Sequence, residues 1–380
     1  MSGAAGLLVH CRAGFEKECA QELTAFAREA GVEGFVKARP DSAWALFQPF
    51  DVPAGRRLWS GLGLDDFVFA RQVVLAGDLL ADLPVGDRAS PLARAARDLG
   101  ARFRELFVET PDTNDGKALA SLIRPLKPHL DKALAKAGVD VADDAAPERL
   151  HVFFVGGTAA HVGLSRVAAS SPWPMGIPRL RMPSGAPSRS TLKLAEALAH
   201  FLGDEEAARR LVPGMSAVDL GASPGGWTWQ LVRRGLFVTA VDNGPMDAAL
   251  LETGQVKHRR ADAFGFRPAD PVDWMVCDVV ESPSRVAALA AKWVAEGWCR
   301  EAIFNLKLPM KKRWEETGRA REIVAEAFGG RPYRLAMKQL YHDREEITAW
   351  LTAGDGQASA RPMLHSRLPR DRRDPRNRTP

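Results

Sequence analysis

The sequence has few cysteines and no long apolar run. Its four cysteines form no C-x-x-C pair and have no histidine at metal-ligand spacing, which argues against a structural metal or a disulfide framework. No apolar run approaches the roughly 20 residues that span a bilayer. The apolar stretch at residues 3–9 is too short for a signal peptide and lacks a basic leader. We therefore expect a cytoplasmic protein without a metal or a membrane segment.

Net positive charge is missing from most of the chain. The formal charge is +5, but residues 361–380 hold seven Arg and two Asp, a net of +5, so the first 360 residues sum to zero. The overall charge is therefore no sign of a basic binding face. The tail has few apolar residues and several prolines, which predicts disorder. Both phosphate contact and a solubilising role stay open for it.

At 380 residues the chain is long enough for two or three domains. Residues 1–65 show a βαββ pattern typical of a ferredoxin-like α+β unit. Its expected strands and helix lie at 6–11, 15–30, 34–38 and 43–47.

Residues 66–168 predict a second α+β unit. Its expected elements are a strand at 67–75, helices at 91–99 and 119–136, and a hairpin formed by 149–155 and 159–165. Five prolines mark residues 169–187 as a semi-rigid linker.

From residue 188 to residue 360, strand patterns alternate with helix patterns, which predicts a doubly wound, Rossmann-like α/β sheet. The expected strands are 216–220, 237–241, 256–260, 272–277, 303–306, 333–339 and 347–351. The expected helices include 191–201, 228–234, 284–296 and 315–328. Ligands of such sheets bind at the carboxyl ends of the strands.

A glycine-rich loop at 221–226 follows the first of these strands and opens a helix pattern. Glycines let the backbone approach a ligand and expose amides at a helix N-terminus. The loop does not match the dinucleotide fingerprint G-x-G-x-x-G, and Pro224 sits where that pattern needs freedom, so a nicotinamide dehydrogenase is disfavoured. Asp242 and Asp262 follow the next two strands, where carboxylates bind ribose hydroxyls or an adenine amine. Each alone would suit a turn; in series they predict a nucleoside pocket.

The segment Asp-Leu-Gly-Ala-Ser-Pro-Gly-Gly-Trp at 219–227 resembles the S-adenosylmethionine loop of the FtsJ-like RNA 2′-O-ribose methyltransferases. Longer stretches resemble one branch, the bacterial 23S rRNA 2′-O-ribose cytidine methyltransferase M family. They are Ser-Pro-Trp-Pro-Met-Gly-Ile-Pro-Arg at 171–179, Ser-Arg-Ser-Thr-Leu-Lys at 188–193, Val-Asp-Asn-Gly-Pro-Met at 241–246, Trp-Met-Val-Cys-Asp at 274–278, Phe-Asn-Leu-Lys-Leu-Pro-Met-Lys-Lys at 304–312 and Tyr-His-Asp-Arg-Glu-Glu at 341–346. The family carries an N-terminal RNA-binding THUMP domain, which implies that role for residues 66–168.

The resemblance also implies a Lys-Asp-Lys-Glu tetrad and an S-adenosylmethionine site. The implied tetrad is Lys193, Asp278, Lys307 and either Glu345 or Glu346, and the alternation before Ile347 favours Glu346. The implied cofactor contacts are Ser190, Ser223, Pro224, Gly225, Gly226, Asp242, Asp262 and Asp278. Many family members have cysteine where Ser223 stands, and both side chains are small.

A ribose 2′-hydroxyl is a very weak acid, so its attack on a sulfonium methyl needs alignment and a proton acceptor. We assign Lys307 as that acceptor. A protonated amine cannot accept a proton; burial and the neighbouring Lys193 favour the neutral amine, whereas Asp278 favours the charged form. The sequence leaves this balance open. Asp278 could orient Lys307 and interact with the sulfonium, and Glu346 could position Lys193.

Two stretches contain basic residues and no acids, and both flank the predicted site. The first, 167–195, carries Arg179, Arg181, Arg189 and Lys193; the second, 302–314, carries Lys307, Lys311, Lys312 and Arg313. Phosphate contacts of this kind supply affinity and register. The resemblance implies that the substrate is 23S rRNA and the target a cytidine in its peptidyl-transferase region. We expect a monomer that acts before subunit assembly is complete.

Two other functions compete with this hypothesis. Adenine N6 methyltransferases carry Asn/Asp-Pro-Pro-Tyr where this chain has Cys-Asp-Val-Val at 277–280, and cytosine C5 enzymes need a Pro-Cys or Thr-Cys nucleophile. A non-catalytic RNA-binding protein with a methyltransferase fold is the other alternative. The presence of Lys193, Asp278 and Lys307 argues against it.

Overall fold

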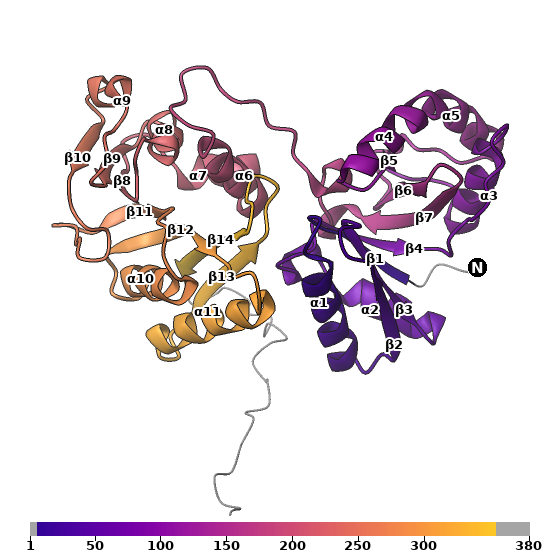
Figure 1. Ribbon diagram of the computed structural model, residues 1–380, viewed down its shortest axis with the longest axis horizontal. Coiled ribbons are helices and arrows are strands. Elements are labelled where there is room, and N and C mark those ends of the chain that lie inside the picture. Colours follow the sequence, from indigo (N-terminus) through magenta and orange to yellow (C-terminus); the bar gives the residue numbers. More distant parts are fainter. Residues whose placement is uncertain (1–5, 355–380) are drawn as a thin grey trace, which may run out of the picture.

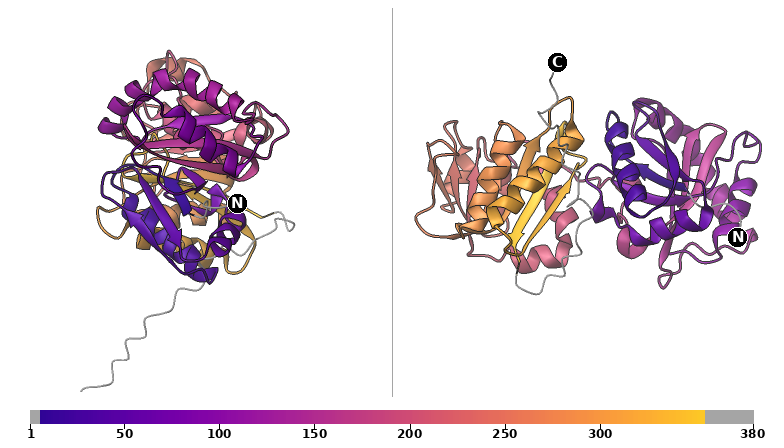
Figure 2. Two further views of the ribbon diagram at one scale, coloured as in Figure 1. Left: turned by 90° about the vertical axis from the view of Figure 1, so that its right-hand side faces the viewer. Right: turned by 90° about the horizontal axis from the view of Figure 1, so that it is seen from below.

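The structure is a computed structural model that describes residues 6–354. The tail at 361–380, for which disorder is predicted, lies outside these residues. Two seven-stranded sheets divide the described chain into an N-terminal half and a C-terminal half, which lie side by side in Figure 1. The linker between them runs across the top of that view, and Figure 2 shows the same two halves from two other sides.

The N-terminal sheet has the strand order β2-β3-β1-β4-β7-β6-β5. Its strands are β1 (Gly6–His10), β2 (Gly34–Ala38), β3 (Trp44–Pro49), β4 (Gln72–Ala76), β5 (Leu106–Glu109), β6 (Glu148–Gly156) and β7 (Ala159–Arg166). Its helices are α1 (Glu16–Glu29), α2 (Val52–Gly61), α3 (Ala89–Leu99), α4 (Asn114–Ile123) and α5 (Lys127–Lys136). Because β4 pairs with both β1 and β7, the two predicted N-terminal units contribute strands to one sheet.

The two faces of this sheet are covered differently. Alternate residues of a strand point to opposite faces. Leu7 and Val9 of β1 pack with the apolar stripes of the helices, whereas Leu8 lies in a second cluster with Met175 and Ile177 of the linker. The first part of the linker therefore forms a wall of the N-terminal half.

Polar contacts hold this part of the linker in place. Gln72 Nε2 donates to Ser171 O at 3.0 Å, and Ser171 N donates back to Gln72 Oε1 at 3.1 Å. Gly176 lies against the backbone of Arg71 with a φ of 67°, and a Cβ atom there would lie 1.9 Å from Arg71 O. Only glycine fits this approach.

The C-terminal sheet has the strand order β10-β9-β8-β11-β12-β14-β13. Its strands are β8 (Ser216–Leu220), β9 (Phe237–Val241), β10 (Val256–Arg259), β11 (Val272–Cys277), β12 (Cys299–Lys307), β13 (Tyr333–Lys338) and β14 (Glu346–Ala353). Its helices are α6 (Thr191–Phe201), α7 (Gly203–Arg210), α8 (Gly226–Val232), α9 (Ala248–Glu252), α10 (Pro283–Ala295) and α11 (Arg313–Phe328). The strands β10, β9, β8, β11 and β12 are parallel, and β14 and β13 add an antiparallel edge.

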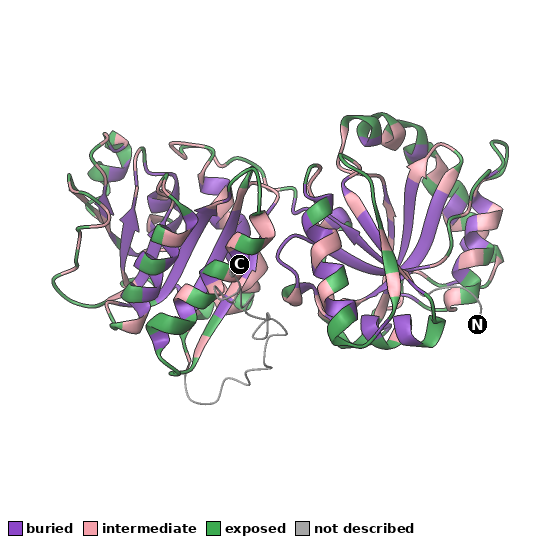
Figure 3. Ribbon diagram, turned by 60° about the horizontal axis from the view of Figure 1, so that its bottom comes forward, coloured by how far each residue is buried: buried purple, intermediate pink, exposed green. Residues whose placement is uncertain are grey.

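Helices cover both faces of this sheet, as the doubly wound prediction requires. Trp274 and Val276 of β11 pack with α6 and α8, whereas Met275 and Cys277 pack with α10. Figure 3 shows the buried strands between helices whose outer faces are exposed. The chain order reverses between β8 and β11, and the carboxyl ends of these strands form the crevice where ligands bind in such sheets.

The connection between β13 and β14, residues 339–345, joins the two halves. Arg71 Nη2 donates to Gln339 Oε1 at 2.9 Å, and Arg12 Nη1 donates to Asp343 O at 3.1 Å. The buried Lys338 ammonium donates to Leu64 O and Phe67 O, each at 2.7 Å. The edge strand β13 and the connection that follows it are thus anchored to the N-terminal half.

Two N-terminal elements differ from the ranges expected from the sequence. The strand expected at 67–75 begins only at Gln72, because the buried amides of Val68 and Phe69 donate to the Glu22 carboxylate instead of a strand. The helix expected at 119–136 is two helices, α4 and α5, since prolines at 125 and 128 lack the amide that a continuous helix needs.

Replacing Gly176 by alanine tests the seat of the linker on Arg71. The new Cβ would collide with Arg71 O, so Gly176→Ala should lower the free energy of unfolding by about 2–4 kcal/mol. The matched control is Gly185→Ala in the same linker, which has a φ of 81° and open space around it. It should lose only the backbone cost of about 1–2 kcal/mol. Urea unfolding followed by tryptophan fluorescence measures both; equal losses would contradict the assigned contact.

Candidate active site at the carboxyl edge of the C-terminal sheet

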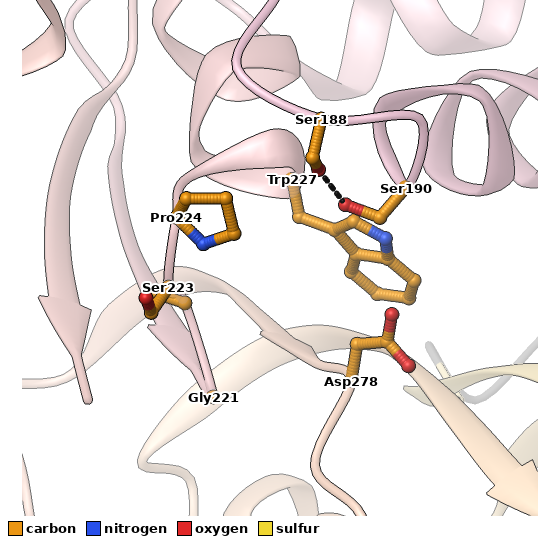
Figure 4. A pocket seen from close by; sticks show the side chains of 8 residues that line it. Ser188, Ser190, Gly221, Ser223, Pro224, Trp227 and Asp278 are labelled. Atoms are coloured by element: carbon orange, nitrogen blue, oxygen red, sulfur yellow. Dashed lines mark hydrogen bonds between the residues drawn. The ribbon is translucent and has the colours of Figure 1, made fainter. Parts of the chain in front are cut away.

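A pocket opens where β8 passes through the glycine loop into α8. Its volume is about 250 Å³. The lining residues are Ser188, Ser190, Gly221, Ala222, Ser223, Pro224, Trp227 and Asp278. Figure 4 shows the Trp227 indole near Ser190 and Asp278, with Ser188 and Ser190 hydrogen-bonded to each other at 2.6 Å. The predicted loop, the start of α6 and the end of β11 therefore meet at one cavity.

The wall between the loop and α6 depends on a residue without a side chain. A Cβ atom at Gly226 would lie 2.1 Å from Ser190 Oγ and 2.5 Å from Ser188 Oγ. Among the residues that the structure describes, Trp227 Nε1 is buried and has no hydrogen-bond partner. A buried donor and a close backbone approach are features of a cavity built for a polar ligand.

The two acids predicted for a nucleoside pocket lie in different surroundings. Asp242 follows β9 and supports the loop: its carboxylate accepts from Ser223 N at 3.1 Å and from Gly244 N at 2.7 Å. Asp262 is exposed and accepts from Gly265 N at 2.9 Å within its own turn. Asp262 does not line the pocket.

The four predicted tetrad residues meet beside the pocket, from four different elements. Lys193 Nζ lies 3.3 Å from Asp278 Oδ2 and 2.7 Å from Glu346 Oε2. Lys307 Nζ lies 3.2 Å from Asp278 Oδ1 and 3.4 Å from Glu346 Oε1. Each lysine thus contacts both carboxylates. Asp278 also lines the pocket, so it belongs to the cavity and to the charge cluster alike.

This cluster is mostly shielded from water and balanced in charge. The four side chains are between 14% and 24% exposed, with Lys307 the most open. Burial lowers the pKa of the Lys193 ammonium, but the carboxylates of Asp278 and Glu346 outweigh burial and raise it above its ordinary value. Lys193 is therefore a firmly held cation.

Glu345 and Glu346 have separate environments, which bears on the choice left open by the sequence. Glu346 opens β14 opposite Lys307 and points into the cluster. Glu345 is more exposed and pairs with Arg313. Arg313 also donates to Gly14 O at 3.0 Å, so this arginine is used within the protein.

Sequence reasoning missed Asn305, which binds both carboxylates of the cluster. Its Nδ2 lies 3.0 Å from Asp278 Oδ1 and 3.0 Å from Glu346 Oε2. Asn305 precedes Lys307 by two positions in β12, and residues two apart share a face of the sheet. This spacing was the available signal. Ser188, another residue missed, lines the pocket, and Trp227 is both buried and part of the lining.

A buried carboxylate outside the charge cluster lies behind the glycine loop. Asp219, in β8, accepts a hydrogen bond from Thr228 Oγ1 at 2.6 Å, which ties the strand to the first turn of α8. Burial raises the pKa of Asp219 to about 7, and the nearby Asp278 adds to the rise.

A doubly wound sheet with a glycine loop, a pocket at the switch point and an adjacent charge cluster defines a methyltransferase of the FtsJ-like class. Residues 186–311 match the family model described as FtsJ-like methyltransferase. Within the described chain no group of three or more His, Cys, Asp or Glu side chains could hold a metal ion. Residues 6–354 also contain no helix with the length and apolar character of a membrane span.

Two further family models match the N-terminal half: the RlmM ferredoxin-like domain over residues 4–74, and ribosomal RNA large subunit methyltransferase M, N-terminal, over residues 87–166. Ribosomal RNA large subunit methyltransferase M of Methylococcus capsulatus is 50% identical over 353 residues, covering 92% of this chain and 99% of the relative. The Cellvibrio japonicus protein of the same name is 49% identical over 347 residues, covering 91% and 98%. The chain belongs to the ribosomal RNA large subunit methyltransferase M family, which confirms the resemblance inferred from its motifs.

The raised pKa of Asp219 predicts a specific pH dependence of stability. The folded state holds a proton on Asp219 that the unfolded state releases above about pH 4, so the contribution of this residue to stability falls as the pH rises to about 7. The stability difference between the wild type and Asp219→Asn should therefore shrink by up to about 1.4 kcal/mol per pH unit across that window. Urea unfolding of both proteins at several pH values measures it. Parallel stability curves would show that Asp219 is ionised in the folded protein.

Proposed function

We propose that this enzyme transfers a methyl group from S-adenosylmethionine to the ribose 2′-hydroxyl of a cytidine in the peptidyl-transferase region of 23S rRNA. The observation that carries the proposal is the double role of Asp278, which lines the pocket and contacts both lysines. A methyl donor in the pocket and a hydroxyl near Lys307 would thus lie on either side of one carboxylate.

The pocket residues fit S-adenosylmethionine in chemistry. Ser190, Ser223, Pro224 and Asp278 line the cavity where the donor would lie. We also assign the adjoining loop residues Gly225 and Gly226 to the cofactor site, and Asp242 holds the loop through Ser223 N. We also assign Asp262 to the cofactor site, where release of its turn contact with Gly265 would free the carboxylate for an adenine amine. When bound, S-adenosylmethionine supplies an electrophilic methyl group on a sulfonium.

We assign Lys307 as the acceptor of the 2′-hydroxyl proton. It is the more exposed of the two lysines and ends β12 at the carboxyl edge, where a nucleotide can approach. Lys193 is the less suitable base, because its 2.7 Å contact with Glu346 is shorter than either carboxylate contact of Lys307, and the carboxylates raise its pKa. Lys193 instead supplies a fixed positive charge beside Lys307, and a nearby like charge disfavours an additional one. Asp278 and Glu346 orient both amines.

Exposed basic side chains around the site support an RNA substrate. Arg179 and Arg181 in the linker are exposed, and so are Arg189 just before α6 and Lys311 and Lys312 after β12. They suit contacts to phosphates that position the strand without reading its sequence. We assign RNA binding also to residues 66–168, as a THUMP-type module, and expect a monomer acting in the cytoplasm on rRNA before subunit assembly is complete.

Replacing the proposed base gives the direct test. Lys307→Ala should abolish 2′-O-methylation, a loss of at least about 100-fold as is typical for a general base, while S-adenosylmethionine still binds. Methyl transfer to rRNA and calorimetric cofactor binding measure the two effects. The control is Lys257→Ala on the exposed strand β10, which should retain full activity.

A mapping experiment identifies the target. The 2′-O-methyl stop on rRNA should vanish in a deletion strain and return with the wild type but not with Lys307→Ala. Turnover retained by Lys307→Ala would remove this residue from the base role. Cofactor binding by the wild type without methylation of any RNA would favour the non-catalytic alternative.

Filling the loop wall tests the cofactor site. Gly226→Ala places a Cβ atom against Ser190 and Ser188, so S-adenosylmethionine affinity should fall at least about tenfold, or roughly 1.4 kcal/mol. Gly318→Ala is the matched control, because nothing lies within 4 Å of a Cβ atom at that helical position. Calorimetry with S-adenosylmethionine measures both variants. Unchanged affinity in Gly226→Ala would place the cofactor elsewhere.

A further inference from the structure

A fully buried amide lies beneath the charge cluster. Asn305 Nδ2 donates to Asp278 Oδ1 and to Glu346 Oε2. The same two oxygens also accept from lysines, since Asp278 Oδ1 lies 3.2 Å from Lys307 Nζ and Glu346 Oε2 lies 2.7 Å from Lys193 Nζ. The amide and Lys307 thus bind the same oxygen of Asp278, and the amide and Lys193 bind the same oxygen of Glu346.

The register of the sheet fixes the place of this amide. β12 pairs with β14 so that Asn305 lies opposite Thr348 and Lys307 lies opposite Glu346. Residues two apart in a strand and their cross-strand partners share one face. All four side chains therefore lie on the face covered by α6, the helix that supplies Lys193.

A buried hydroxyl sets the orientation of the amide. Thr348 Oγ1 lies 2.7 Å from Asn305 Oδ1 and 2.9 Å from Asp343 Oδ2. The hydroxyl can donate to Asn305 Oδ1, which assigns the amide oxygen to this side. With its oxygen bound, the amide presents its NH2 group to the two carboxylates.

We propose that Asn305 is a positioning residue of the methyl-transfer site, an inference that rests on the function proposed above. Its NH2 group holds the Asp278 and Glu346 carboxylates in place without changing the balance of two cations and two anions. A basic side chain there would add a third cation, and an apolar one would leave both buried carboxylates short of a donor.

The shared oxygens give the amide an influence on Lys307. The charged groups around Lys307 are Asp278 from β11, Glu346 from β14 and Lys193 from α6, with Asp343 close enough to interact with Glu346 and Lys193. A donor on the same Asp278 oxygen weakens the hold of that oxygen on the Lys307 ammonium. Asn305 thereby favours the neutral amine that accepts the proton.

The test compares Asn305→Asp and Asn305→Ala with the wild type in methyl transfer to rRNA across a range of pH. Asn305→Asp adds a third carboxylate that favours protonated Lys307, so the alkaline rise of kcat should occur at a pH higher by about 1–3. Each rise of the lysine pKa by about one lowers the fraction of neutral amine tenfold. At neutral pH kcat should therefore fall about tenfold or more. KM for rRNA and calorimetric S-adenosylmethionine affinity should stay unchanged, and alkaline pH should restore kcat. Asn305→Ala should show a smaller change in the same direction.

Controls separate this inference from the proposed function and from misfolding. Thr352→Val, at the far end of β14 from the site, should leave the pH profile unchanged. Thermal unfolding reports on the fold of each variant. Should Asn305→Asp not fold, Thr348→Val, which frees the amide, should move the profile in the same direction. A lowered kcat with an unmoved profile, or lost cofactor affinity, would overturn the positioning role. Cofactor binding by the wild type without methyl transfer to any RNA would instead overturn the proposed function.

Discussion

The site depends on the mutual neutralisation of two lysines and two carboxylates at the end of a buried sheet face. An isolated buried charge is strongly unfavourable, but a hydrogen-bonded, balanced cluster is tolerated. On this face apolar residues such as Ile303 and Trp350 fill the interior, and the charge cluster lies at the carboxyl edge of β12. No member of the cluster could be buried alone, so α6, β11, β12 and β14 must assemble before any of the four side chains is stable in place.

This dependence extends to the N-terminal half through residues 339–345. Arg12 and Arg71 hold this connection at its backbone and at Gln339, and Glu196 of α6 accepts from Tyr341 N and His342 N at 2.8 Å. The connection leads directly into Glu346 and carries Asp343, which supports Thr348. The N-terminal half and the charge cluster therefore share one structural segment, residues 339–345. A shift of the N-terminal half would act on the position of Glu346 through this segment.

Periodicity predicted the C-terminal sheet well, because alternating strands and helices leave a regular apolar pattern. Three of the tetrad residues, Asp278, Lys307 and Glu346, lie at strand ends, and Lys193 lies in the first turn of α6. The preference for Glu346 came from the same alternation. The role of Asn305 was not predicted, because a single asparagine in an apolar strand has no pattern of its own. Its contacts depend on the long-range pairing of β12 with β14. α2 and β5 were not predicted for a related reason, since short elements are fixed by packing against a sheet and not by their local sequence.

The position of Asp278 couples the cofactor pocket to the proposed base. Its carboxylate oxygens are divided among two ammonium groups and one amide. A cation placed beside Asp278 would compete for those oxygens and repel a proton on Lys307 by like-charge interaction. Binding of a sulfonium would therefore favour the neutral amine at the moment when a methyl group is at hand.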